Sequence, residues 1–86
     1  MRQVASGYVE PYGTRVDARG CTLKRRGLCW WELRVPSEAL PVFVLATWGA
    51  GESIVTEDGP GVYQIHSLSE DKSAPESVLK VKVWTK

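Results

Sequence analysis

The chain has few of the residues on which metal binding depends. Its 86 residues include two cysteines and one histidine. Cys21 and Cys29 lie well apart in the sequence, and the third and fourth ligands that a structural zinc site needs are missing. The glycine-containing stretch at residues 49–53 is not followed by the Lys-Ser or Lys-Thr pair of a phosphate-binding loop. We therefore expect a protein without a metal or a small-molecule cofactor.

A nucleophile with a base beside it is equally scarce. Cys21 or Cys29 together with His66 is the one combination that the sequence offers. Both cysteines fall on the predicted core face of their strands, where a cysteine usually behaves as a small, inert hydrophobe. A single histidine in a strand is more often structural than catalytic. We expect a protein that is not an enzyme.

Long hydrophobic runs are missing as well. The longest, at residues 40–48, is far shorter than the roughly 20 apolar residues of a membrane-spanning helix. The N-terminal residues lack the apolar core of a signal peptide. We expect a cytoplasmic protein that has no membrane partner. In that compartment Cys21 and Cys29 remain reduced thiols, with a disulfide between them as the alternative.

What the sequence has in abundance is alternation of apolar and polar residues. This period of two is typical of β-strands, and helical periodicity is almost absent. Segments with strand character cover residues 3–10, 14–23, 28–35, 42–48, 53–56, 62–68 and 77–86. We expect residues 1–86 to form a single all-β domain, a small antiparallel barrel or sandwich of about six strands. One short helical turn is predicted near residues 37–40, with Ser37 as its cap.

In the predicted strand at residues 14–23, the apolar residues move midway from even-numbered to odd-numbered positions. Val16 and Ala18 share one face, whereas Cys21 and Leu23 fall on the other. A β-bulge at residues 19–20 reconciles the two halves, because Gly20 can adopt the positive φ that such a bulge often needs.

Residues 21–31 predict a β-hairpin whose tip is basic. A three-residue loop at residues 25–27 pairs Lys24 with residue 28 and keeps Leu23 on the core face with Cys29 and Trp31. A four-residue loop would turn the charged residues of the second arm inward, which is costly, so we favour the shorter loop.

Two strands differ in the position that their patterns predict within a sheet. Residues 42–48 are apolar on both faces, which suits a central strand covered on both sides. Residues 77–86 direct Lys80 and Lys82 outward, a feature that protects sheet edges from unwanted pairing. Trp31 and Trp48 are expected in the core.

Five residues form the predicted binding surface: Lys24, Arg25, Arg26, Trp30 and Trp84. Tryptophan and arginine dominate the energetics of many protein interfaces. A solvated turn is the structural alternative for the basic residues, and a covering layer or dimer mate is the alternative for the two tryptophans. We expect a small protein-binding module that docks on another protein or on a second copy of itself. Small inhibitors, adaptors and accessory proteins of mobile elements share this size and character.

The alternative function is nucleic-acid binding by a small barrel that resembles the OB and SH3-like folds in architecture. Basic residues interleaved with aromatic ones could follow phosphates and stack on bases. The formal net charge of +1 weighs against it. The charges are segregated along the chain, with a net charge of +4 over residues 1–34, −6 over residues 35–76 and +3 over residues 77–86. If the two ends meet in the fold, the protein has a basic and an acidic side.

Overall fold

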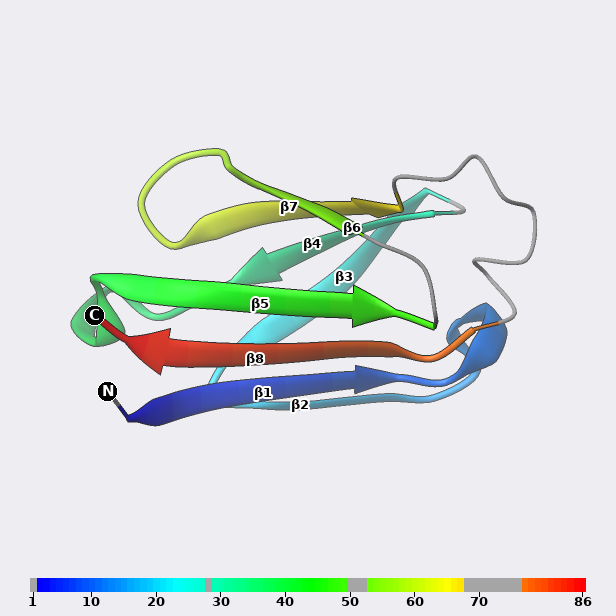
Figure 1. Ribbon diagram of the computed structural model, residues 1–86, viewed down its shortest axis with the longest axis horizontal. Coiled ribbons are helices and arrows are strands. Elements are labelled where there is room, and N and C mark those ends of the chain that lie inside the picture. Colours follow the sequence, from blue (N-terminus) through cyan, green and yellow to red (C-terminus); the bar gives the residue numbers. More distant parts are fainter. Residues whose placement is uncertain (1, 28, 50–52, 68–76) are drawn as a thin grey trace.

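A computed structural model describes residues 2–27, 29–49, 53–67 and 77–86 as two antiparallel β-sheets (Figure 1). Sheet A has the strand order β2-β1-β8-β5, and sheet B has the order β3-β4-β7-β6. The strands are β1 (Gln3–Val9), β2 (Val16–Arg19), β3 (Thr22–Gly27), β4 (Trp30–Arg34), β5 (Val42–Trp48), β6 (Ser53–Glu57), β7 (Val62–Ser67) and β8 (Leu79–Thr85). The predicted all-β, antiparallel fold is confirmed, and the described residues form eight strands where about six were expected.

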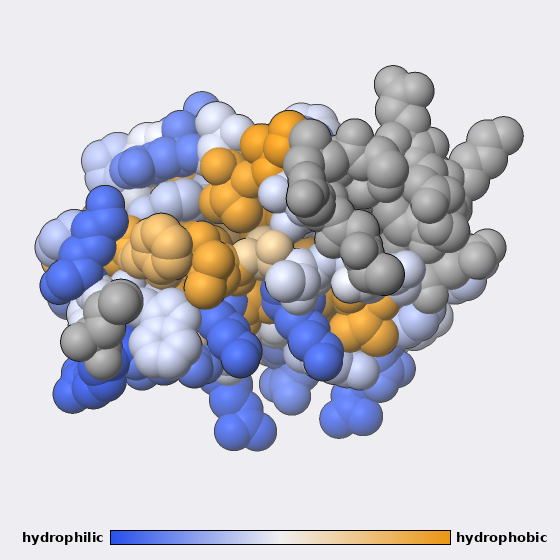
Figure 2. Space-filling view, in the orientation of Figure 1, coloured by the Kyte–Doolittle hydropathy of each residue, from blue (hydrophilic) through white to orange (hydrophobic). Residues whose placement is uncertain are grey.

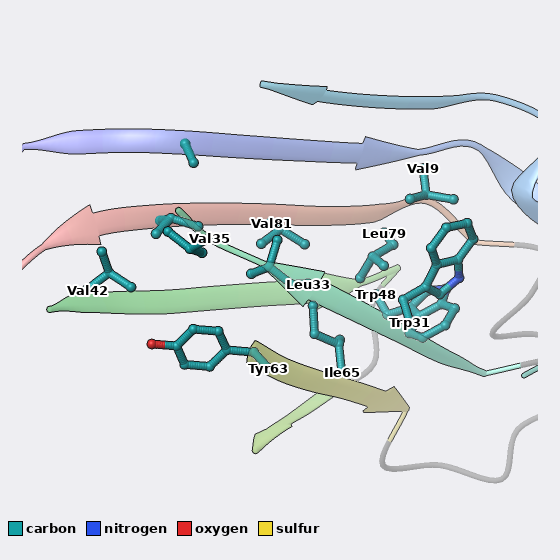
Figure 3. Close-up of a cluster of buried hydrophobic side chains, with 12 residues drawn as sticks. Val9, Trp31, Leu33, Val35, Val42, Trp48, Tyr63, Ile65, Leu79 and Val81 are labelled. Carbon is teal, nitrogen blue, oxygen red and sulfur yellow. The ribbon is translucent and has the colours of Figure 1, made fainter. Parts of the chain in front are cut away.

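The core lies between the two sheets, because each sheet turns its apolar face toward the other (Figure 3). The most deeply buried side chains come from β4, β7 and β8: Leu33, Ile65, Leu79, Val81 and Val83. Trp31 and Trp48 are buried at the same end of the core, as predicted. Each fully buried side chain of this kind contributes about 1.5–3 kcal/mol relative to an exposed one, so this layer holds the sheets together.

The predicted strand at residues 14–23 is in fact two strands that belong to different sheets. β2 pairs with β1 in sheet A, and β3 pairs with β4 in sheet B. Between them Gly20 has a φ of +71°, and a Cβ atom on it would lie 2.6 Å from the carbonyl oxygen of Val4. The change of parity is therefore a crossing from one sheet to the other, and the predicted bulge at residues 19–20 is wrong.

Residues 21–31 do belong to a β-hairpin, but its turn comes later than predicted. Lys24 pairs with Glu32, and Gly27 pairs with Trp30 after a shift of register. Leu23 pairs with Leu33 and Arg25 with Trp31, so Leu23 and Trp31 lie on the core face as expected. The predicted pairing of Lys24 with residue 28 is wrong. Leu28 lies outside the described residues.

β5 and β8 have exchanged the positions that their patterns predict. β8 pairs with β1 on one side and with β5 on the other, so the strand with outward lysines is central. β5 is an edge strand of sheet A, and its outer side chains Phe43 and Leu45 are 46% and 50% exposed. Alternation in a sequence identifies the two faces of a strand, but it carries no information about the strand's lateral neighbours.

The predicted helical turn is present as η2 (Ser37–Ala39), and a second 3-10 turn, η1 (Pro11–Gly13), follows β1. Pro36 occupies the N-cap position of η2, and the hydroxyl of Ser37 donates to Oε2 of Glu38 at 3.4 Å, so the predicted cap is wrong. Among the residues with assigned structure, neither helical turn approaches the length and apolarity of a membrane span.

Candidate functional site

The structure distributes the five predicted binding residues over three surfaces. Lys24, Arg26 and Trp30 belong to the outer face of sheet B, and Trp84 belongs to the outer face of sheet A. Arg25 is paired with the buried Trp31, which turns it toward the end of the sandwich. The three basic residues lie within β3, so the predicted basic tip is wrong.

Trp30 is enclosed by its neighbours on sheet B. Its indole N–H donates to Oε1 of Gln64 at 2.6 Å. The ring of His66 stacks on it with a centroid distance of 5.1 Å, and the guanidinium carbon of Arg26 lies 5.9 Å from its centroid. The two groups come from β7 and β3, the strands on either side of β4. Trp30 is partly buried among them.

Glu32 continues this network and is buried although it points away from the core. Only 6% of the residue is exposed. Its carboxylate accepts a hydrogen bond from Nε2 of Gln64 at 3.0 Å and another from Nε of Arg34 at 3.0 Å. These hydrogen bonds, with the positive charges of Arg34 and Arg26, hold the pKa of Glu32 below its ordinary value of 4.5 and outweigh the effect of burial. Trp30, Gln64, Glu32 and Arg34 on the outer face of sheet B are therefore joined in one hydrogen-bonded network.

Arg25 braces the end of the sandwich. Its Nη1 donates to the carbonyl oxygen of Tyr12 in η1 at 3.5 Å, and its Nε donates to the carbonyl oxygen of Gly27 at 3.3 Å. Gly13 in the same turn packs so closely that a Cβ atom on it would lie 3.3 Å from the ring of Trp31. The position of Arg25 indicates a structural role in holding η1 against sheet B.

The outer face of sheet A exposes apolar side chains (Figure 2). Trp84 is paired with Phe43 across β8 and β5 and is only partly buried. Leu45 continues this apolar surface along β5, whereas Tyr8, which is 39% exposed, lies on β1 beyond the lysines of β8. Contiguous exposed apolar surface is uncommon on proteins and usually marks a contact site.

Cations surround these apolar side chains. Lys80 and Lys82 extend from β8 onto the same face, and Arg19 of β2 and Lys82 are both paired with Ser6 from opposite sides. In the part of the chain that the structure describes, the one ion pair joins Arg34 to Glu32 on the other sheet. We call this surface the lysine face and define it by seven residues: Tyr8, Arg19, Phe43, Leu45, Lys80, Lys82 and Trp84.

A shallow hollow of about 190 Å³ lies in the lysine face, where the small side chain of Ser6 separates the longer ones. Arg19, Lys80 and Lys82 line it together with a single acidic residue, Asp17. The hollow is therefore a positively charged depression bordered by one aromatic residue, Tyr8. It suits an acidic group on a partner surface.

The cysteines are free thiols, both partly buried. The thiol of Cys21 donates to the carbonyl oxygen of Ser6 at 3.5 Å, and burial raises its pKa above the ordinary value of 9.0. A protonated thiol is a poor nucleophile and a poor metal ligand. The described residues contain no cluster of three or more side chains of the metal-binding types.

No family model, curated protein or solved structure matches this chain. Its candidate site is therefore defined by geometry. Of the seven residues of the lysine face, only Trp84 is among the five predicted binding residues. The missing apolar and aromatic ones are Phe43, Leu45 and Tyr8, and the missing cations are Arg19, Lys80 and Lys82. The apolar outer face of residues 42–48 was a usable signal for the first two, but it was assigned to burial in a central strand. Tyr8 carried no such signal, because one tyrosine in an alternating strand is common on solvated faces.

Proposed function

We propose that this protein is a non-enzymatic protein-binding module and that the lysine face is its contact surface. The observation that carries the proposal is the exposure of Phe43 and Leu45 beside lysines that have no ion-pair partner among the described residues. Exposed apolar side chains provide binding energy when a partner removes them from water. Trp84 supports this assignment, because tryptophan is enriched among the residues that dominate interface energetics.

The charge of the lysine face defines the chemistry of the partner. Three cations and one anion, Asp17, line the central hollow. A partner with an apolar knob and flanking carboxylates would cover Phe43 and Leu45 and neutralise the lysines. Complementary charge of this kind raises the rate of association and excludes partners of the wrong sign. We therefore propose an acidic protein surface as the ligand.

The outer face of sheet B fits this function less well. Trp30 and Glu32 already find their partners within the sheet, at 2.6 and 3.0 Å respectively. A second protein would have to replace those hydrogen bonds to use the same groups, so it would gain little from contacting them.

The test compares two variants that change equally exposed apolar residues. Phe43→Ser removes an apolar contact from the lysine face, whereas Ile54→Ser removes one of 45% exposure from β6 of the other sheet. The full chain and both variants are used as baits for affinity purification from the native host, followed by mass spectrometry. We expect a specific partner to be retained by Ile54→Ser and lost by Phe43→Ser. Retention of every partner by Phe43→Ser would remove the lysine face from consideration.

Nucleic-acid binding is the second candidate, and one observation favours it. Lys80, Lys82 and Trp84 follow one another at every second position of β8 and so share one face. This strand could therefore contact phosphates and a base. Fluorescence anisotropy of a labelled single-stranded oligonucleotide tests this directly. Binding that weakens steeply with added salt would support it, and absence of binding at low salt, where phosphate contacts are strongest, would exclude it.

A further inference from the structure

The four edge strands of the two sheets differ in charge. β2, β3 and β6 each contain charged residues: Asp17 and Arg19, Lys24 to Arg26, and Glu57. β5, with the sequence VFVLATW, contains none. Charged side chains on an edge strand are the usual protection against pairing with another chain. β5 lacks that protection.

The backbone hydrogen bonds at the two ends of β5 show which of its residues bond to β8. Gly49 N–H donates to the carbonyl oxygen of Val78 at 3.0 Å, and Lys86 N–H donates to the carbonyl oxygen of Pro41 at 3.3 Å. Antiparallel ladders alternate with a period of two residues. The odd-numbered residues of β5 therefore bond to β8, and the even-numbered residues direct their backbone groups away from it.

A side-chain contact confirms this direction. The hydroxyl of Ser53 at the start of β6 donates to the carbonyl oxygen of Ala46 at 2.6 Å, from the side opposite to β8. Ser53 thus satisfies one outward carbonyl at the C-terminal half of β5. In the described ranges no strand pairs with β5 on this side, so the outward N–H and C=O groups of Val42, which is 4% exposed, and of the partly buried Val44 have no strand partner.

Space is available beside that half of the strand. A hollow of about 460 Å³ separates the start of β5 from the hairpin that joins β6 to β7. Leu40, Val42 and the ring of Tyr63 form its apolar wall. A strand added to β5 would lie about 4.8 Å from it, over this hollow, and an inward side chain of the added strand would enter the hollow.

We propose that the edge of β5 pairs antiparallel with β5 of a second copy of this chain. A pairing centred on Phe43 sets Val42 opposite Val44 of the second copy and so uses the backbone groups that are left on this edge. Because β5 carries no charge, every pair in this register is compatible with its mate. Val44 of the second copy would point into the hollow beside Tyr63. The two sheets A would then form one continuous sheet, with both lysine faces on the same side.

The interface is small. A single pair of strands buries less than about 1,200 Å², which is typical of weak and transient associations. The expected state is therefore a monomer–dimer equilibrium that depends on concentration. The proposal rests on the backbone edge of β5 and not on binding of an acidic partner, although Phe43 belongs to both surfaces.

The first test is sedimentation equilibrium of the full chain and of Val44→Pro. Proline removes an N–H that points away from β8, and edge strands tolerate proline at such positions. We expect the native chain to form dimers and the dissociation constant of Val44→Pro to rise at least about tenfold, which corresponds to about 1.4 kcal/mol. A native chain that stays monomeric at all attainable concentrations would overturn the proposal, even if β5 captured a peptide from another protein.

A second pair of variants guards against a folding defect in the proline variant. Phe43→Lys places two like charges opposite each other across the dimer axis, which destabilises the pair. Ile54→Lys introduces the same charge at matched exposure on β6, outside the interface. We expect the first variant to be monomeric and the second to associate as the native chain does. Dimers that survive both Phe43→Lys and Val44→Pro would place the interface elsewhere.

Oxidative crosslinking tests the register. Non-hydrogen-bonded antiparallel pairs bring Cα atoms to about 4.5 Å, within the range that a disulfide can span. Phe43→Cys, in a background in which Cys21 and Cys29 are replaced by serine, should therefore form a crosslinked dimer. Ile54→Cys in the same background should not. Crosslinking of both variants at equal rates would contradict the proposed register.

Discussion

The outer faces of the two sheets have similar chemical compositions and opposite organisation. Each presents a tryptophan near arginine or lysine residues. On sheet B, Trp30, Gln64 and Glu32 are joined by hydrogen bonds of 2.6 and 3.0 Å. On sheet A, Lys80 and Lys82 have no ion pair within the described part of the chain. The comparison teaches that residue type alone does not identify a binding surface, because the same residues can be committed to partners inside the fold.

The two faces should differ most in how much stability the protein loses when the tryptophan of each face is removed. Trp30→Ala removes a hydrogen bond, worth about 1 kcal/mol net, and an aromatic stacking contact, worth roughly another 1 kcal/mol. We expect Trp30→Ala to lower the free energy of unfolding by about 2 kcal/mol in urea denaturation, and Trp84→Ala to lower it by clearly less. Equal losses for the two variants would erase the distinction between the faces.

Acid should weaken sheet B selectively. The pKa of Glu32 in the folded chain lies below the ordinary value of 4.5 that applies to the unfolded chain. The stability that this carboxylate contributes is therefore fully present above pH 4.5 and is lost as the pH falls through the folded-state pKa. We expect thermal stability to decline over this acid range, and Glu32→Gln to make the decline shallower. A decline of the same steepness in Glu32→Gln would assign it to other carboxylates.

The smallest expected effect on stability belongs to the lysine face. Lys80→Ala and Lys82→Ala remove charges that have no partner in the described structure, so each should change the free energy of unfolding by less than about 0.5 kcal/mol. Chemical denaturation of the double variant measures this. Under the proposed function, the same double variant binds the acidic partner more weakly and with less dependence on salt. A double variant that unfolds much more easily would show that the lysines have a structural role.

The faces of the strands were predictable from the sequence, and their neighbours were not. Leu79, Val81 and Val83 point inward and Lys80 and Lys82 outward, as alternation predicts. Yet β8 is central although its lysines are typical of an edge strand, and β5 is an edge although it is apolar on both sides. Lateral order depends on pairing between segments far apart in the chain, which a local pattern does not contain.

The exposure of Glu32 illustrates a second limit. Its outward direction follows from the period of two, and charged side chains on an outer face are usually exposed. The side chains of Gln64 and Arg34, which lie on a neighbouring strand and two residues away, cover it. A parity argument identifies the face on which a side chain lies, whereas burial depends on the size and hydrogen-bonding capacity of the side chains around it.

Gly20 shows a third limit. The change of parity at residues 19–20 was a genuine signal that the strand is interrupted there. A bulge and a crossing between sheets both require a residue that accepts a positive φ, so glycine is expected in either case. Only the pairing of β2 with β1 and of β3 with β4 distinguishes them.

The pairing of β1 with β8 has a consequence for how the chain is made. The four strands of sheet B lie between Thr22 and Ser67, so all of them leave the ribosome before residues 79–85 do. β1 emerges first, but its neighbour on one side emerges last. During synthesis the nascent chain therefore holds β1 and β5 without the strand that joins them, and contacts of such large sequence separation form late. Sheet A can therefore be completed only after β8 has left the ribosome.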